Sequence, residues 1–158
     1  MTDETGADAD HSEGIIEALR RARESGRPVY INGGGSKRHV AGRECEAEAC
    51  HVRPHRGIID YQPGELVITA RGGTPVFELA ATLASENQGL SFEPPRLSGR
   101  ATIGGTLACN LSGPGRPWGG SVRDRVLGVQ LISGRGERLD FGGKVMKNVA
   151  GYDISRLQ

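Results

Sequence analysis

The chain has 158 residues, 36% hydrophobic and 25% charged, which is the size and balance of one soluble globular domain. Its 20 Lys and Arg residues and 19 Asp and Glu residues leave a net charge of +1, which excludes a strong field for nucleic acid or an anionic membrane. Three irregularly spaced cysteines exclude a disulfide framework, and 25 glycines clustered between apolar runs indicate specialised loops.

The first eleven residues are mostly acidic, polar or small, and we expect residues 1–11 to form a disordered tail. They lack the apolar core of a signal peptide. No stretch of the chain approaches the roughly 20 apolar residues of a membrane span. We therefore expect a cytoplasmic protein without an integral membrane segment.

The first predicted elements are a helix and two short strands. Apolar residues recur on one face over about residues 13–25, with Ser12 as the predicted N-cap and a Gly-Arg-Pro stop after the helix. The strand at 29–31 runs directly into a glycine cluster, and a second strand is predicted near 51–53.

The middle of the chain predicts a hairpin followed by a helix. Two apolar segments, 58–61 and 66–70, are joined by a Gln-Pro-Gly-Glu turn. Thr74 and Pro75 have the types preferred at the N-cap and first position of a helix, which we expect to end near Gly89.

The last third predicts a long loop and a second hairpin. Residues 92–95 contain two prolines and cannot be helical, and residues 96–124 are predicted to be a loop region with a second glycine cluster. Strands at 126–132 and 137–141 are joined by a Ser-Gly-Arg-Gly turn. This order of elements indicates an α+β fold and not a doubly wound repeat.

The first glycine cluster, residues 32–37, reads Asn-Gly-Gly-Gly-Ser-Lys directly after a strand. Glycines that adopt positive φ let successive N–H groups point into one concavity, which binds phosphate oxygens. A flexible turn that binds nothing is an equal alternative. A P-loop nucleotidase is a poor match, because its lysine follows a glycine whereas Lys37 follows Ser36.

The second glycine cluster spans residues 100–110 and 113–124. Gly104 and Gly105 precede small and apolar residues that can begin a short helix, so a ligand could lie against bare backbone there. A loop packed by its own side chains is the alternative. Two separated glycine loops favour a large, extended ligand that carries phosphate.

These segments carry a resemblance to a known family. Residues 32–37, 101–106 (Ala-Thr-Ile-Gly-Gly-Thr) and 118–128 resemble the FAD-binding domain shared by vanillyl-alcohol oxidase and p-cresol methylhydroxylase. Residues 113–128 and 141–157 resemble more narrowly the FAD-binding subunit of bacterial glycolate oxidase. The resemblance implies a p-cresol methylhydroxylase (PCMH)-type FAD-binding domain of two small α/β subdomains.

The resemblance also implies boundaries and binding residues. The FAD-binding domain is expected over 12–158, with subdomains at about 12–90 and 91–158, and the chain is expected to be truncated before the rest of the flavin domain and a cap domain. FAD is expected to be noncovalent, because Ser36 and Lys37 stand where covalent members often have a histidine. The implied cofactor-binding residues are Asn32, Gly33, Gly34, Gly35, Ser36, Lys37, Pro95, Thr102, Ile103, Gly104, Gly105, Thr106, Asn110, Gly119, Asp124 and Val129.

The implied function is FAD binding in a complex that oxidises a small 2-hydroxy acid, glycolate to glyoxylate, and passes the electrons to a partner. The implied partners are a second FAD subunit and an iron–sulfur subunit, through which the protein would lie at the inner membrane. A stand-alone D-lactate dehydrogenase-type flavoenzyme and a non-catalytic scaffold subunit remain alternatives. No catalytic acid or base can be assigned, so the fragment alone is expected to be inactive.

A metal site is not expected. Cys45, Cys50, His51 and His55 form a C-x4-C-H-x3-H pattern, which matches no standard structural zinc site. The same stretch fits a strand with polar flanks.

Overall fold

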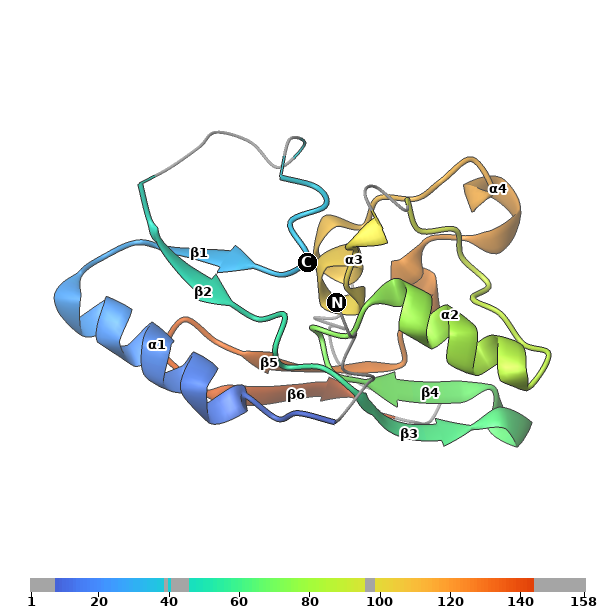
Figure 1. The fold of residues 1–158 in the computed structure, drawn as a ribbon, viewed down its shortest axis with the longest axis horizontal. Coiled ribbons are helices and arrows are strands. Elements are labelled where there is room, and N and C mark those ends of the chain that lie inside the picture. Colours follow the sequence, from blue (N-terminus) through green and yellow to red (C-terminus); the bar gives the residue numbers. More distant parts are fainter. Residues whose placement is uncertain (1–7, 39, 41–45, 96–98, 144–158) are drawn as a thin grey trace, which may run out of the picture.

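The computed structural model describes residues 8–38, 40, 46–95 and 99–143, which form an α+β fold as predicted (Figure 1). The elements in this part of the chain are α1 (Ser12–Ser25), β1 (Val29–Asn32), β2 (Glu48–His51), β3 (Ile58–Gln62), η1 (Pro63–Glu65), β4 (Val67–Ala70), α2 (Val76–Ser85), α3 (Ile103–Cys109), α4 (Arg116–Gly119), η3 (Val122–Arg125), β5 (Gly128–Ile132) and β6 (Arg138–Gly142). They include three two-stranded sheets, β1–β2, β3–β4 and β5–β6.

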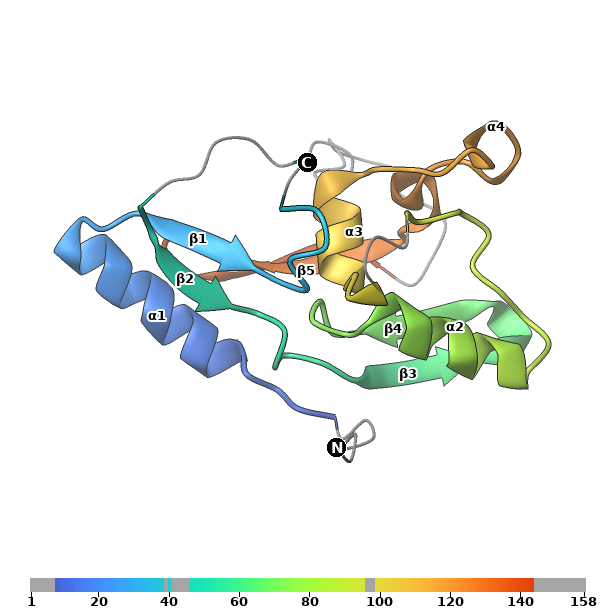
Figure 2. The same ribbon diagram turned by 45° about the horizontal axis from the view of Figure 1, so that its top comes forward.

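The first unit is α1 with the parallel pair β1–β2, which lie side by side in Figure 2. α1 buries Ile15, Ile16 and Ala22, and Cys50 of β2 is also buried. Gly26 ends the helix in the left-handed conformation at φ 66°, which glycine adopts without steric cost. The predicted N-cap is wrong: α1 begins at Ser12, and its N-cap is His11, because the Ser12 side chain bonds back to Asp10.

The segment before α1 is attached to the domain. Ala9 forms an antiparallel bridge with Arg56. Arg71 donates from Nε to Asp8 Oδ1 at 2.6 Å and lies 3.0 Å from Asp10 Oδ2. The prediction of a disordered tail is therefore wrong for residues 8–11, because these carboxylates have a fixed cation as partner. Residues 1–7 lie outside the described residues.

The second unit contains the antiparallel pair β3–β4, with α2 beside β4 in both ribbon views (Figures 1 and 2). α2 buries Val76, Leu79 and Leu83. The predicted cap is displaced by one residue, because Pro75 and not Thr74 is the N-cap. The Thr74 hydroxyl instead accepts from the amide of Gly57 at 2.9 Å and donates to its carbonyl at 3.1 Å.

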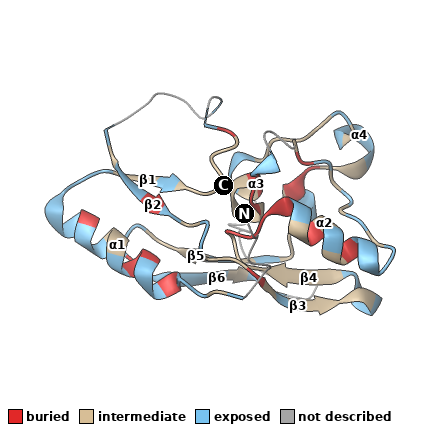
Figure 3. Ribbon diagram, viewed as in Figure 1, coloured by how far each residue is buried: buried red, intermediate tan, exposed pale blue. Residues whose placement is uncertain are grey.

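The predicted loop region 96–124 contains three helical segments, α3, α4 and η3, although residues 96–98 lie outside the described part. A bridge between Pro75 and Thr102 joins the starts of α2 and α3. The buried residues of Figure 3 concentrate where these helices meet. They include Thr74, Thr102, Thr106 and Val122, each with 2% exposure or less. A small, partly polar core therefore lies beside the glycine clusters.

The predicted hairpin β5–β6 is confirmed, with Val129 opposite Phe141. β5 packs against α1, so the hairpin of the predicted second subdomain lies on the first unit. The boundary near residue 90 remains a prediction, and residues 144–158 lie outside the described part. Within the described residues, no helix combines the length and apolar character that crossing a bilayer requires.

Candidate cofactor site

The first glycine run begins where β1 ends. The carbonyl of Asn32 accepts the last ladder hydrogen bond from Val52 at 3.0 Å, and the chain then turns with Gly35 at φ 64°. Among the described residues, no acceptor takes a hydrogen bond from the amides of residues 33–37. Five successive amides are therefore without an acceptor in the described part of the chain, which fits the predicted phosphate nest.

This run packs against the backbone that precedes α3. A Cβ on Gly33 would lie 2.9 Å from Thr102 Oγ1, and a Cβ on Gly34 would lie 1.5 Å from the carbonyl oxygen of Arg100. Side chains at these two positions would collide with the neighbouring segment. The two glycine clusters, 66 or more residues apart in sequence, are thus brought together, which the flavin interpretation needs.

The amides of the second run, in contrast, are already used. Ile103 N donates to Thr74 O at 2.9 Å, Gly104 N to Gly72 O at 2.9 Å and Thr106 N to Thr102 O at 2.9 Å. Gly105 N donates to the Thr102 hydroxyl, the N-cap of α3, at 3.3 Å. These donors therefore stabilise the start of α3, and none of the four is free for a ligand that would lie against bare backbone there, as the sequence suggested.

The reason for glycine at position 104 is backbone contact. A Cβ there would lie 2.8 Å from the carbonyl oxygen and 3.0 Å from the Cα of Gly72. A Cβ on the next glycine, Gly73, would lie 2.4 to 2.7 Å from carbonyl oxygens of the 52–55 segment. Gly72 and Gly73 thus fill the narrow space between α3 and that segment.

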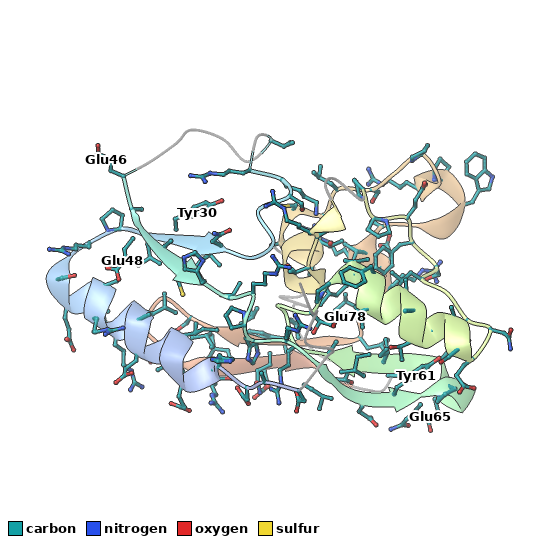
Figure 4. All side chains as sticks on the ribbon, in the orientation of Figure 1. Tyr30, Glu46, Glu48, Tyr61, Glu65 and Glu78 are labelled. Atoms are coloured by element: carbon teal, nitrogen blue, oxygen red, sulfur yellow. The ribbon has the colours of Figure 1, made fainter. Side chains whose placement is uncertain are left out.

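A hollow of about 520 Å³ opens beside the first glycine run, and its lining is strongly basic. Arg56 is paired with Glu78, at the start of α2 in Figure 4, at 3.0 Å, and Arg38 lies over the ring of Tyr30 at 5.8 Å. Arg53 and Arg100 have no acidic partner among the described residues. The lining consists of Asn32, Gly33, Gly34, Gly35, Arg38, His51, Arg53, Pro54, Arg56 and Arg100.

The sequence interpretation missed these arginines. The basic segment 51–56 could have indicated an anion site, but its histidines were considered only as part of a metal pattern. Arg100 lies far from this segment in the sequence, so no local pattern connects the two. Cys45 lies outside the described residues, and Cys50 is buried, which raises the pKa of its thiol. In the described ranges, no group of three or more His, Cys, Asp or Glu side chains is placed to hold a metal ion.

Lys37 is the other cation of the glycine run, and it is only 7% exposed. The described residues provide it with neither an ion pair nor a hydrogen bond. An anionic ligand at the glycine run would supply a countercharge for it.

A second set of polar atoms lies along α3 and η3. Thr106 is fully buried on α3, and Asn110 is its C-cap, in the left-handed conformation that asparagine tolerates. In the described part of the chain, the buried side-chain atoms without a hydrogen-bond partner are Thr106 Oγ1, Asn110 Oδ1, Ser112 Oγ and Arg123 Nε. Buried polar atoms are normally satisfied, so this side of α3 fits a ligand with several polar groups.

The remaining predicted residues do not line the hollow. Gly119 ends α4, where a Cβ would lie 2.3 Å from the carbonyl oxygen of Ser91. Asp124 Oδ2 accepts from both the amide and the hydroxyl of Ser121 at 2.8 Å, so its carboxylate caps η3. Val129 pairs within the hairpin, and Pro95 is half-buried. Their predicted contacts with a cofactor stay predictions.

Comparisons with known proteins agree with this geometry. A family model described as "FAD binding domain" matches residues 7–142. Among solved structures, alkyldihydroxyacetonephosphate synthase is similar with a TM-score of 0.71 at 18% identity, over 94% of this chain and 27% of that chain. This likeness shows the fold and supports the predicted architecture.

Curated relatives give a more specific comparison than the family model. Glycolate oxidase subunit GlcE of Escherichia coli is 51% identical over 95% of this chain and 43% of its own length. Glycolate oxidase subunit GlcD of Bacillus subtilis is 30% identical over 93% of this chain and 31% of its own. D-lactate dehydrogenase of Archaeoglobus fulgidus is 29% identical over 93% of this chain and 33% of its own length. The chain spans less than half the length of these relatives.

Proposed function

Because the chain belongs to the FAD binding domain family and its cofactor is FAD, we propose that the first glycine run holds the FAD diphosphate. The open amides of residues 33–37 are the observation that carries this proposal. Lys37, which is only 7% exposed, and the basic hollow add the positive charge that a diphosphate requires. Binding is noncovalent, since no described residue of the run is a histidine.

The flavin half of FAD lies along α3 in this proposal. Thr106, Asn110 and Ser112 offer polar oxygens without partners, and Arg123 offers a donor. Such groups match the hydroxyls of a ribityl chain and the polar edge of an isoalloxazine. When bound, FAD supplies a two-electron acceptor, and the residues of this chain orient it.

We further propose that the chain is the FAD-binding part of a glycolate oxidase subunit, which oxidises glycolate to glyoxylate and passes the electrons to partner subunits. The 51% identity to the E. coli subunit supports this over a stand-alone D-lactate dehydrogenase, whose similarity is 29%. A second FAD subunit and an iron–sulfur subunit are the proposed partners. They would hold a cytoplasmic protein at the inner membrane.

The first experiment is an absorption spectrum of the purified protein. Bands near 370 and 450 nm, approximate values for oxidised flavin, are expected. All of the flavin should leave the protein on acid precipitation and be identified as FAD. A colourless protein that does not take up added FAD would contradict the cofactor proposal, and flavin retained in the precipitate would contradict noncovalent binding.

A second experiment tests the complex. The subunit is combined with its partner subunits, and flavin bleaching is followed after addition of glycolate or D-lactate. Faster bleaching with glycolate, and only in the presence of partners, is expected. If activity survives substitution of the glycine run and loss of this subunit's FAD, the subunit is a scaffold.

A further inference from the structure

We propose that Arg53 and Arg100 bind the FAD diphosphate beside the first glycine run, as a pair of guanidinium groups. This inference rests on the proposed FAD site and adds the side chains that select a diphosphate. The glycine run alone would accept any phosphate through its amides. The two arginines give the site its preference for a diphosphate over a single phosphate group.

The segments that carry these two residues both adjoin the glycine run. Gly33 faces the side chain of Val52, whose Cγ2 would lie 3.9 Å from an added Cβ, and Arg53 follows Val52 directly. Gly34 lies against the carbonyl of Arg100. Arg53 and Arg100 both line the same hollow of about 520 Å³.

The charges of the hollow distinguish these two arginines from the others. Glu78 already neutralises Arg56, and Arg38 stacks on Tyr30. Arg53 and Arg100 are exposed and form no ion pair with the described residues. A planar guanidinium can donate two parallel hydrogen bonds to one phosphate group, which an ammonium cannot. Two free guanidinium groups therefore match the two phosphates of a diphosphate.

The test measures FAD binding by the loss of flavin fluorescence in titrations of flavin-free protein. We expect Arg53→Gln and Arg100→Gln each to weaken FAD about tenfold, which is about 1.4 kcal/mol. The variants Arg53→Lys and Arg100→Lys should bind FAD with affinities between those of wild type and the Gln variants, because the charge remains but the paired hydrogen-bond geometry is lost. Arg135→Gln, in the turn of the β5–β6 hairpin, is the matched control and should bind as wild type does.

Competition experiments test the selection of a diphosphate. ADP and inorganic pyrophosphate should displace FAD from wild type more effectively than AMP does, and this difference should vanish in the double Gln variant. The wild-type affinity should also fall more steeply with ionic strength than that of the double variant. A thermal melt of each variant confirms that it is folded, and the Lys variants serve if a Gln variant is not.

Each outcome distinguishes the two proposals. A wild-type protein that binds no FAD overturns the proposed cofactor site itself. FAD binding that is equal in wild type and the double Gln variant overturns only the role of the two arginines. Equal competition by AMP and ADP in wild type also contradicts that role.

Discussion

The two glycine clusters of this molecule have similar composition but opposite uses of their backbone. Residues 33–37 follow a strand end, and their amides find no acceptor among the residues that the structure describes, whereas residues 103–106 begin α3 and donate all four amides within the protein. Glycine in the first cluster exposes donors, and glycine in the second lets two backbones touch. A glycine pattern alone therefore does not show which peptide groups reach a ligand.

The difference follows from the surroundings of each cluster. The first leaves the sheet at the end of β1, where no further strand residue takes up its donors. The second is enclosed by Gly72, Thr74 and the N-cap Thr102, which supply acceptors at helical spacing. The proposed ligand site therefore lies at the cluster whose amides find no acceptor in the described part of the fold.

The largest expected effect is that of Gly34→Ala, which tests the first cluster. The added methyl would lie 1.5 Å from the Arg100 carbonyl oxygen, so the run must move away from residues 100–102. We expect a loss of about 3 kcal/mol in the free energy of unfolding. Because the residues of the run that line the hollow then shift, FAD retention should be lost as well. Denaturant unfolding and a flavin titration measure the two effects.

Gly35→Ala is the control for this prediction. Its Cβ would find open space, with Asn32 Oδ1 at 3.6 Å, and only the positive φ of 64° is unfavourable. We expect a loss of about 1 kcal/mol from that conformation. If the two variants were equally stable and bound FAD equally, the close contact at Gly34 would have no role.

The second prediction concerns Gly104→Ala. A methyl at this position would press on Gly72 at 2.8 Å, and we expect a loss of about 2 kcal/mol in the free energy of unfolding. The folded fraction should keep the wild-type FAD affinity, since the amide of Gly104 already donates to Gly72. The expected effect of bulk at Gly104 is thus on stability and not on FAD affinity.

Gly105→Ala is the matched variant one position later. Its Cβ would meet only the Thr102 hydroxyl at 3.1 Å, and alanine favours a helix over glycine. Its stability should stay within about 0.5 kcal/mol of wild type. A selective loss of FAD in Gly104→Ala at unchanged stability would restore the interpretation from sequence.

The order of polar and apolar residues along the sequence predicted much of this fold. The amphipathic face of α1 and the β-forming residues of β5 and β6 are properties of neighbouring residues, and all three elements were found. The N-cap residues were harder to predict, because the hydroxyls of Ser12 and Thr74 form hydrogen bonds with Asp10 and Gly57 and do not cap the helices. The parallel pairing of β1 with β2 depends on tertiary contacts that no local pattern records.

The candidate site was predictable only in part, for the same reason. The glycine run after β1 has a recognisable order of residues, and the expectation that it lies near the second cluster agrees with the contacts of Gly33 and Gly34. Arg53 and Arg100 reach the hollow from separate segments, so their proximity exists only in the folded chain. Hydrogen-bond use at 103–106 depends likewise on Gly72 and Thr74.

A smaller effect is expected for Thr106→Val, which tests whether the second cluster contacts the ligand through side chains. The Thr106 hydroxyl is buried without a partner, so replacing it with a methyl group should stabilise the flavin-free protein by about 1 kcal/mol. If the hydroxyl bonds to FAD, the same change should weaken FAD binding several-fold. Thermal melts with and without FAD measure both quantities, and a variant that is destabilised without FAD would show an unseen partner for the hydroxyl.

The smallest effect should come from the ion pairs that attach residues 8–10 to Arg71, on the side of the second cluster. The hydrogen bond from Arg71 lowers the pKa of Asp8, and the hydrogen bonds from Ser12 lower the pKa of Asp10 to about 2. Folding thus favours both ionised carboxylates. Their contribution to stability is complete above the ordinary pKa of 3.8 and disappears as the pH falls through the lowered pKa of each group, which for Asp10 is about 2.

Arg71→Gln should therefore lower the melting temperature slightly at pH 7 and approach wild type as the pH falls below 4. The carboxylates are about half exposed, so the change should be small and should shrink in high salt. Burial lowers the pKa of His55 as well, so folding favours its neutral form. This contribution to the stability of the protein begins to be lost at a higher pH, as the pH falls below the ordinary pKa of 6.5. FAD affinity at pH 7 should not change, because Arg71 adjoins Gly72 and not the open amides. A large loss of FAD in this variant would mean that the packing of the second cluster controls the first.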